Sequence, residues 1–167
     1  MVDVQHILVP TDFSRGSVAA LDWAASIAER FGASIALLHV VEVPAGLSEA
    51  TLVRSAPEGP MVPVGEFLRD AAVEQLQLAV RSLESRGVAA RYLIQTGAAH
   101  REILHEVDTA DVDLVVMGTH GRTGLRHLLL GSTAERVIRQ SPVPVTVVRV
   151  PEADYQRVDA DPPSDAP

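Results

Sequence analysis

Glycine and hydroxyl residues recur at fixed spacing in one stretch near the end of the sequence. Gly118 and Gly121 are three residues apart, nine residues intervene, and then Gly131, Ser132 and Thr133 follow. Glycine has no Cβ, so a bulky ligand can approach the backbone closely at these positions. A helix that starts at such a loop points free N–H groups and the positive end of its dipole at the ligand. The stretch therefore predicts a binding site for an anionic ligand.

The loop is predicted to connect a buried strand to a helix. The apolar run at residues 114–117 is typical of a short buried strand, and residues 133–140 have helical spacing with Val137 and Ile138 on the inner face. Because glycines also serve ordinary turns, a strand–loop–helix crossover that binds nothing is the alternative interpretation.

Ser132 and Glu135 have the spacing of a capping box at the start of this helix. In a capping box the N-cap hydroxyl accepts a backbone N–H of the first turn, and the acidic side chain three residues later returns to the N-cap. We therefore expect Ser132 to be the N-cap and the helix to begin at Thr133.

Two residue types are missing from the chain, and each absence excludes a kind of chemistry. There is no cysteine, which excludes thiol nucleophiles, disulfides and thiolate metal sites. There is also no lysine, which excludes the phosphate loop of the Walker A type and Schiff-base catalysis. Any positive charge at an anion site must therefore come from arginine, histidine or a bound cation.

The overall charge and hydrophobicity limit the partners. A net charge of −8 argues against nucleic acid, because a phosphate backbone requires a basic protein face. The apolar runs are far shorter than the ~18 residues that cross a bilayer. No basic segment followed by a long apolar stretch marks a signal peptide at the N-terminus. We expect a cytoplasmic protein that binds neither nucleic acid nor membrane.

The length of 167 residues predicts one domain with a sizeable core. We expect that domain to occupy residues 1–150. Residues 151–167 are rich in proline and aspartate and contain few apolar side chains, which predicts an acidic, disordered tail.

Strands and helices are predicted to alternate along the domain. In order, the expected elements are a strand at 4–9, a helix at 14–31, a strand at 35–41, a helix at 65–86, a strand at 88–95, a helix at 100–107, a strand at 114–117, a helix at 133–140 and a strand at 145–150. This pattern predicts an α/β fold, an open five-stranded parallel sheet with helices on both faces. Residues 42–64 have no periodicity. A connection this long is expected to be a lid, a partner surface or a disordered segment, and the sequence does not distinguish these alternatives.

The first helix has recognisable ends and an apolar stripe. Ser14 or Asp12 is expected to cap its N-terminus, and Gly32 is expected to end it. Helical spacing places Trp23 and Phe31 on the buried stripe, together with several alanines.

Ligands of open parallel sheets bind beyond the carboxyl ends of the strands, where the strand order reverses. Two strand ends carry polar or glycine residues, namely Pro10, Thr11 and Asp12 after the first strand and Gly118 after the fourth. If these two strands are neighbours in the sheet, both loops face one crevice. His39 is expected in the core or the crevice wall, and the turn with Asp108, Asp111 and Asp113 is expected to be solvated at the opposite end.

Over residues 3–150 the sequence resembles the ATP-binding branch of the universal stress protein family. The family motif is glycine, two residues, glycine, nine residues, glycine and serine, and it is complete from Gly118 to Ser132. The segments ILVPTDFS at 7–14, LLHV at 37–40 and PVPV at 142–145 also match. The resemblance implies a Rossmann-like fold of the adenine nucleotide alpha hydrolase type.

The resemblance also implies that the ligand is ATP, with Mg²⁺ expected beside it. The implied adenosine side consists of Pro10, Thr11, Asp12, Val40, Met117 and Gly118. The implied triphosphate side consists of Thr119, Gly121, Gly131, Ser132 and Thr133. Countercharge is expected from Arg122, Arg126 or the divalent ion.

Three functions are compatible with these residues. The first is a stress-response regulator that binds ATP with little or no turnover. The second is a slow ATPase, or a nucleotidyl or phosphoryl transferase, that uses Asp12 and His120 with a divalent metal. The third is an interaction module that binds no nucleotide. The resemblance further implies a homodimer that pairs through the strand from Val145 to Val150, which is expected at the edge of the sheet.

Overall fold

The computed structural model describes residues 3–119 and 130–150. Its elements, in chain order, are β1 (His6–Pro10), α1 (Arg15–Phe31), β2 (Ser34–Val41), β3 (Leu52–Arg54), β4 (Met61–Pro63), α2 (Val64–Ser85), β5 (Ala90–Thr96), α3 (Ala99–Thr109), β6 (Leu114–Gly118), α4 (Ser132–Gln140) and β7 (Val145–Val148). The predicted tail at 151–167 lies outside the described residues. None of the described helices has the length and apolar content needed to cross a membrane.

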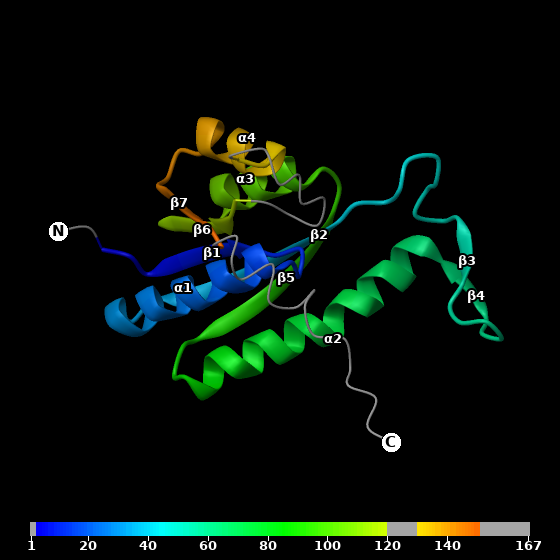
Figure 1. Ribbon diagram of the computed structural model, residues 1–167, viewed down its shortest axis with the longest axis horizontal. Helices are drawn as coiled ribbons and strands as arrows, with labels where there is room; N and C mark the ends of the chain where they lie inside the picture. The colour runs from blue at the N-terminus through cyan, green and yellow to red at the C-terminus, as the bar shows by residue number, and fades with distance from the viewer. Residues whose placement is uncertain (1–2, 120–129, 151–167) are drawn as a thin grey trace, which may run out of the picture.

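The main sheet has five parallel strands in the order β5-β2-β1-β6-β7 (Figure 1). The predicted α/β fold is therefore confirmed. β1 pairs with β2 on one side and with β6 on the other, so the order of connections reverses between β1 and β6. This is the switch point at which a crevice is expected. The first and fourth strands of the sheet are neighbours, which is the condition for the loops after them to face one crevice.

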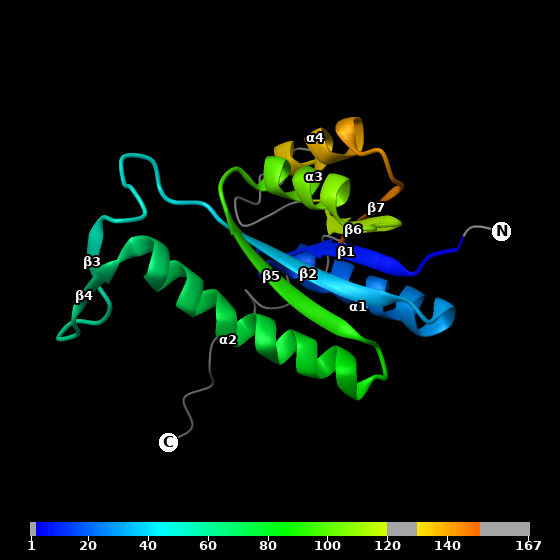
Figure 2. The ribbon, with the colours of Figure 1, turned by 180° about the vertical axis from the view of Figure 1, so that it is seen from behind.

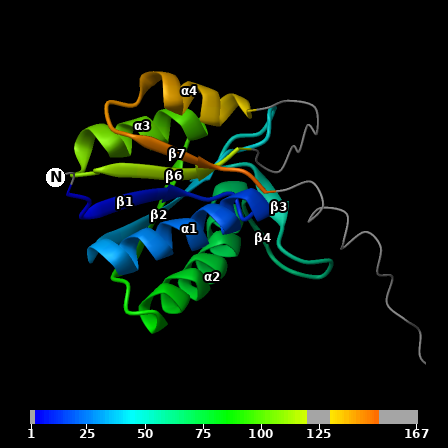
Figure 3. The same ribbon diagram turned by 60° about the vertical axis from the view of Figure 1, so that its left-hand side comes forward.

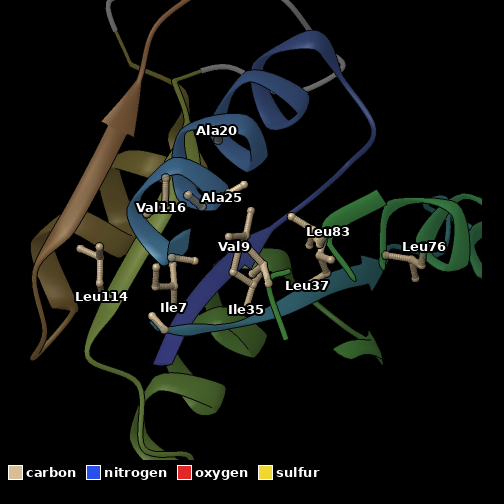
Figure 4. Packing of buried hydrophobic residues seen from close by; sticks show 14 of the residues in the cluster. Ile7, Val9, Ala20, Ala25, Ile35, Leu37, Leu76, Leu83, Leu114 and Val116 are labelled. Carbon is tan, nitrogen blue, oxygen red and sulfur yellow. The ribbon is translucent and has the colours of Figure 1, made fainter. Parts of the chain in front are cut away.

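The helices form one layer on each face of the sheet, with α1 and α2 on one face and α3 and α4 on the other (Figure 3). Alternate residues of each strand serve the two layers, because successive side chains of a strand point to opposite faces. Ile7 and Val9 pack with α1 and α2 (Figure 4), whereas Leu8 packs with α3 and α4. Both layers are apolar, which explains why the strands read as nearly continuous apolar runs.

The ends of α1 agree with the sequence, but its buried face does not. Ser14 caps the helix by accepting the N–H of Ser17, and Gly32 ends it in the left-handed conformation with φ of 71°. Trp23 and Phe31 were expected in the core and are 54% and 55% exposed, so that prediction is wrong. The core side of α1 consists instead of small residues, namely Ala20, Ala24, Ala25 and Ala28. Small side chains let the helix lie close to the sheet, which leaves no room there for large rings.

The excursion between β2 and α2 contains regular structure that sequence periodicity did not indicate. β3 and β4 form an antiparallel pair beyond the end of the main sheet (Figure 2). Each strand has three residues, and Leu52 and Met61 are exposed, so the usual alternation of apolar and polar residues is absent. The segment is attached to the start of α2, where Arg69 donates to Glu49 at 3.1 Å.

Asp113 has a structural role that was not expected of a solvated turn. Its Oδ2 accepts the backbone N–H groups of Gln5 and His6, both at 2.8 Å. These two hydrogen bonds hold the pKa of the Asp113 carboxyl below its usual value. The side chain therefore fixes the start of β6 against the start of β1, at the end of the sheet away from the switch point.

Candidate functional site

A cavity of about 440 Å³ opens at the carboxyl ends of β1, β2 and β6. This size is within the range of ~300–1,000 Å³ that is typical of small-molecule sites. Ten of the twelve predicted site residues line it, namely Pro10, Thr11, Asp12, Val40, Met117, Gly118, Thr119, Gly131, Ser132 and Thr133. The other two, Gly121 and Arg122, lie outside the described residues, as do His120 and Arg126.

The turn after β1 forms one wall of the cavity. Thr11 Oγ1 accepts the N–H of Phe13 at 3.1 Å, and Asp12 Oδ1 accepts the N–H of Ser14 at 3.1 Å. Phe13 has φ of 64°, which is unusual for a residue with a side chain. The N-cap of α1 is Ser14, so Asp12 does not cap the helix and instead closes the turn that precedes it.

His39 of β2 lines the same cavity, as expected of a crevice-wall histidine. It is 9% exposed, and its Nδ1 lies 2.8 Å from the carbonyl oxygen of Thr11. The rings of His39 and Phe13 are in contact, with centroids 4.7 Å apart and planes tilted by 31°.

The end of β6 forms the opposite wall, and Gly118 is required there by packing. A Cβ built on Gly118 would lie 2.7 Å from the carbonyl carbon of Gly16 in α1. The glycine therefore allows the first turn of α1 to approach β6. Beyond it, the N–H of Gly131 donates to the carbonyl of Thr119 at 2.7 Å. This bond brings the start of α4 beside the end of β6.

The first turn of α4 faces the cavity, but the capping box is not formed. Gly131 is the N-cap and the helix begins at Ser132, one residue earlier than predicted. The Glu135 carboxylate pairs with Arg139 at 2.8 Å, so it does not return to the N-cap. Ile138 is 42% exposed, which contradicts its predicted inner position, whereas Val137 is buried as predicted.

The charges that line the described part of the cavity are negative. Asp12 and Glu42 contribute carboxylates, and within residues 3–119 and 130–150 neither lysine nor arginine contributes to the lining. Glu42 Oε1 accepts the N–H of Ala99 at 3.0 Å, which places its charge at the N-terminus of α3. The first turn of α4 offers positive potential to an anion in this part of the cavity.

Part of the lining was not predicted as site. Leu68, Ala71, Ala72 and Gln75 of α2 border the cavity from one side, and Ala99 and Ile103 of α3 border it from the other. The apolar members appear in the sequence only as helical stripes, which indicate a core and not a ligand. Gln75 gives no signal of its own, because polar residues are common on the outer face of a helix.

Comparisons with known proteins agree with this fold. The model of the universal stress protein family matches residues 3–149. Universal stress protein MJ0531 of Methanocaldococcus jannaschii is 35% identical over 150 residues, covering 90% of this chain and 85% of that protein. The solved structure of protein MJ0577, from the same organism, has a TM-score of 0.73 at 29% identity and covers 90% of this chain and 99% of its own.

A third relative was solved with a nucleotide. The universal stress protein of Archaeoglobus fulgidus in complex with dAMP has a TM-score of 0.59 at 19% identity, covering 88% of this chain and 98% of that one. At this level of identity the likeness shows the shared fold alone.

Proposed function

Since this chain belongs to the universal stress protein family, we propose that it binds ATP in the cavity at the switch point and acts as a regulator with little or no turnover. One observation carries the proposal. The turn after β1, the end of β6 and the first turn of α4 line a single cavity, although they are far apart in the sequence. A relative of the same fold was solved with dAMP, which is an adenine nucleotide.

The proposed ligand would lie across the carboxyl ends of the strands. Its adenosine would contact Thr11, Asp12, the backbone of Val40, and Met117. Its phosphates would lie at Ser132 and Thr133, where the N–H groups of the first turn of α4 favour negative charge. Asp12 would accept a ribose hydroxyl with the carboxylate that also closes the turn.

The polar side chains of the described lining support a binding role more than catalysis. Asp12 accepts a hydrogen bond that closes its own turn, and His39 is bonded to the same turn. Glu42 accepts the first N–H of α3. Groups that already hold the backbone are poorly placed to activate water. Phosphate release faster than about one per second, an ordinary enzymatic rate, would favour the ATPase or transferase instead.

Mg²⁺ fits this proposal only as a companion of the nucleotide. Within the described residues, no cluster of three or more histidines and carboxylates has the arrangement of a metal site. Mg²⁺ is commonly held by one or two carboxylates together with substrate phosphates. The ion would neutralise phosphate charge that no lysine in this chain offsets.

Titration with Mg-ATP is expected to raise the melting temperature. At a hundredfold excess over Kd, a ligand that binds only the folded state adds about 2.7 kcal/mol to the free energy of unfolding. For a chain of this length that corresponds to roughly 5–10 °C. Differential scanning fluorimetry with ATP, and with UTP as a control for unspecific phosphate effects, measures it. No shift at millimolar ATP would favour the interaction module that binds no nucleotide.

A homodimer through β7 is part of the proposal. β7 is the last strand of the described sheet. The carbonyls of Pro144 and Val148 accept hydrogen bonds from the N–H groups of Val115 and Thr119, on the β6 side. Because backbone groups alternate along a strand, those of Val145 and Val147 point to the open edge, where a second copy would pair. We also propose that residues 1–150 form the nucleotide-binding domain. We propose that the protein is cytoplasmic.

Val147→Pro is expected to convert the dimer into a monomer, because proline removes an N–H on the open edge. Val147→Ala retains that N–H and should remain dimeric. Multi-angle light scattering at micromolar concentration measures the mass of both variants and of the wild type. A monomeric wild type would rule out the proposed dimer.

A further inference from the structure

Thr11, the first residue beyond β1, is attached to β2 at both of its backbone groups. Its N–H donates to the carbonyl of Leu38 at 2.8 Å. Its carbonyl oxygen lies 2.8 Å from Nδ1 of His39. A carbonyl only accepts, so Nδ1 of His39 carries the hydrogen and donates it. β1 ends at Pro10. The imidazole therefore adds a second hydrogen bond that joins β2 to the residue after β1.

The same imidazole also packs against the far side of the turn. Phe13 has a positive φ of 64°, a conformation that is unfavourable for a residue with a Cβ and persists only where its surroundings impose it. Its ring lies on that of His39, with centroids 4.7 Å apart. Its N–H donates to Thr11 Oγ1 at 3.1 Å. His39 therefore contacts both ends of a turn that would relax without external contacts.

We propose that His39 is a positioning residue that holds Thr11 and Asp12 in the conformation that receives the ligand. The hydrogen bond from Nδ1 is the decisive contact, and the Phe13 ring supports it. The inference rests on the proposed nucleotide binding, because Thr11 and Asp12 line the same cavity. His39 precedes Val40 on β2. The bond therefore also fixes the distance between the turn after β1 and Val40, which both belong to the implied adenosine side.

Loss of this bond has a physical consequence for affinity. A turn that samples several conformations must be ordered when the ligand binds, and the apparent affinity falls by the fraction of molecules in the competent conformation. If a tenth of the molecules retain the native turn, Kd rises tenfold. The sheet and most of both core layers lie outside the turn, and of its residues Phe13 alone packs, partly buried, against one of these layers.

Three variants test the proposal. His39→Leu removes the donor and the ring, whereas His39→Asn keeps an N–H donor at the same number of bonds from Cα as Nδ1. Ile94→Ala is the matched control, because Ile94 is the β5 residue paired with His39 and lies outside the cavity lining. Hydrogen exchange of the Phe13 and Ser14 amides without ligand reports the turn, and isothermal titration with Mg-ATP reports affinity.

For His39→Leu we expect both amides to exchange at least tenfold faster and Kd for ATP to rise about tenfold. For His39→Asn and Ile94→Ala we expect both quantities to stay within about threefold of the wild type. The inference is overturned if exchange in His39→Leu is unchanged, if exchange rises while Kd does not, or if His39→Asn behaves as His39→Leu. A wild type that binds no nucleotide while exchange responds as expected overturns the proposed function and supports the role of His39 in the turn.

Discussion

Gly118→Ala is expected to lower the free energy of unfolding by about 3 kcal/mol, the upper end of the usual cost of overpacking. The added Cβ would lie 2.7 Å from the carbonyl carbon of Gly16, and the next contact, with the oxygen of Gly16, would be 2.9 Å. Backbone atoms of a helix cannot rotate away as a side chain does, so α1 or β6 must move. Chemical denaturation followed by circular dichroism measures the loss.

Gly32→Ala separates this collision from the ordinary effect of removing a glycine. Gly32 has φ of 71°, and a Cβ built there meets nothing within 4 Å. Its substitution should cost only the unfavourable backbone conformation, about 1 kcal/mol. A loss at Gly118 no larger than that at Gly32 would show that the contact between α1 and β6 is loose. In that case the first glycine of the motif would have to be explained by the ligand.

Ser132→Asp is expected to weaken ATP binding about a hundredfold, or about 2.7 kcal/mol, while the fold becomes no less stable. A carboxylate at the start of α4 would lie where the phosphates are proposed to bind. Two like charges ~4 Å apart repel by up to ~4 kcal/mol near a protein surface. The same charge favours the helix, because an acidic residue in the first turn adds about 0.3–1 kcal/mol.

The opposite signs of these two effects make the variant informative. Ser132→Asn is its neutral match and should bind ATP within about threefold of the wild type. Isothermal titration gives the affinities, and thermal melting without ligand gives the stabilities. If Ser132→Asp bound ATP as tightly as the wild type, the phosphates would lie elsewhere than at the N-terminus of α4.

The order of the sheet and the walls of the cavity follow from patterns that sequence reasoning detects well. Apolar runs bounded by turns indicated the strands of the main sheet, and right-handed βαβ connections allow few ways to arrange them. Polar residues at Pro10–Asp12 and glycines after Met117 were placed at strand ends. Their convergence depended only on β1 and β6 being neighbours, which the pairing of Leu8 with Val115 confirms.

Other features depend on distances that a one-dimensional pattern does not contain. Helical spacing assigned Trp23 to the core, but the buried face of α1 consists of small residues and Trp23 lies outside it. Ser132 and Glu135 have the spacing of a capping box. The Glu135 carboxylate forms an ion pair with Arg139, one helical turn further on, instead of bonding to the N-cap. The hydrogen bond from His39 to Thr11 joins residues that are 28 apart in the sequence. It could be predicted only from the register in which β1 pairs with β2.

Native mass spectrometry of freshly purified protein decides whether this chain binds an adenine nucleotide. It reports the mass of the assembly and any nucleotide that remains bound to it. We expect a dimer that carries up to two adenine nucleotides, and full occupancy after addition of Mg-ATP. If no nucleotide adduct appeared even after addition of millimolar Mg-ATP, the protein would not be an ATP-binding regulator.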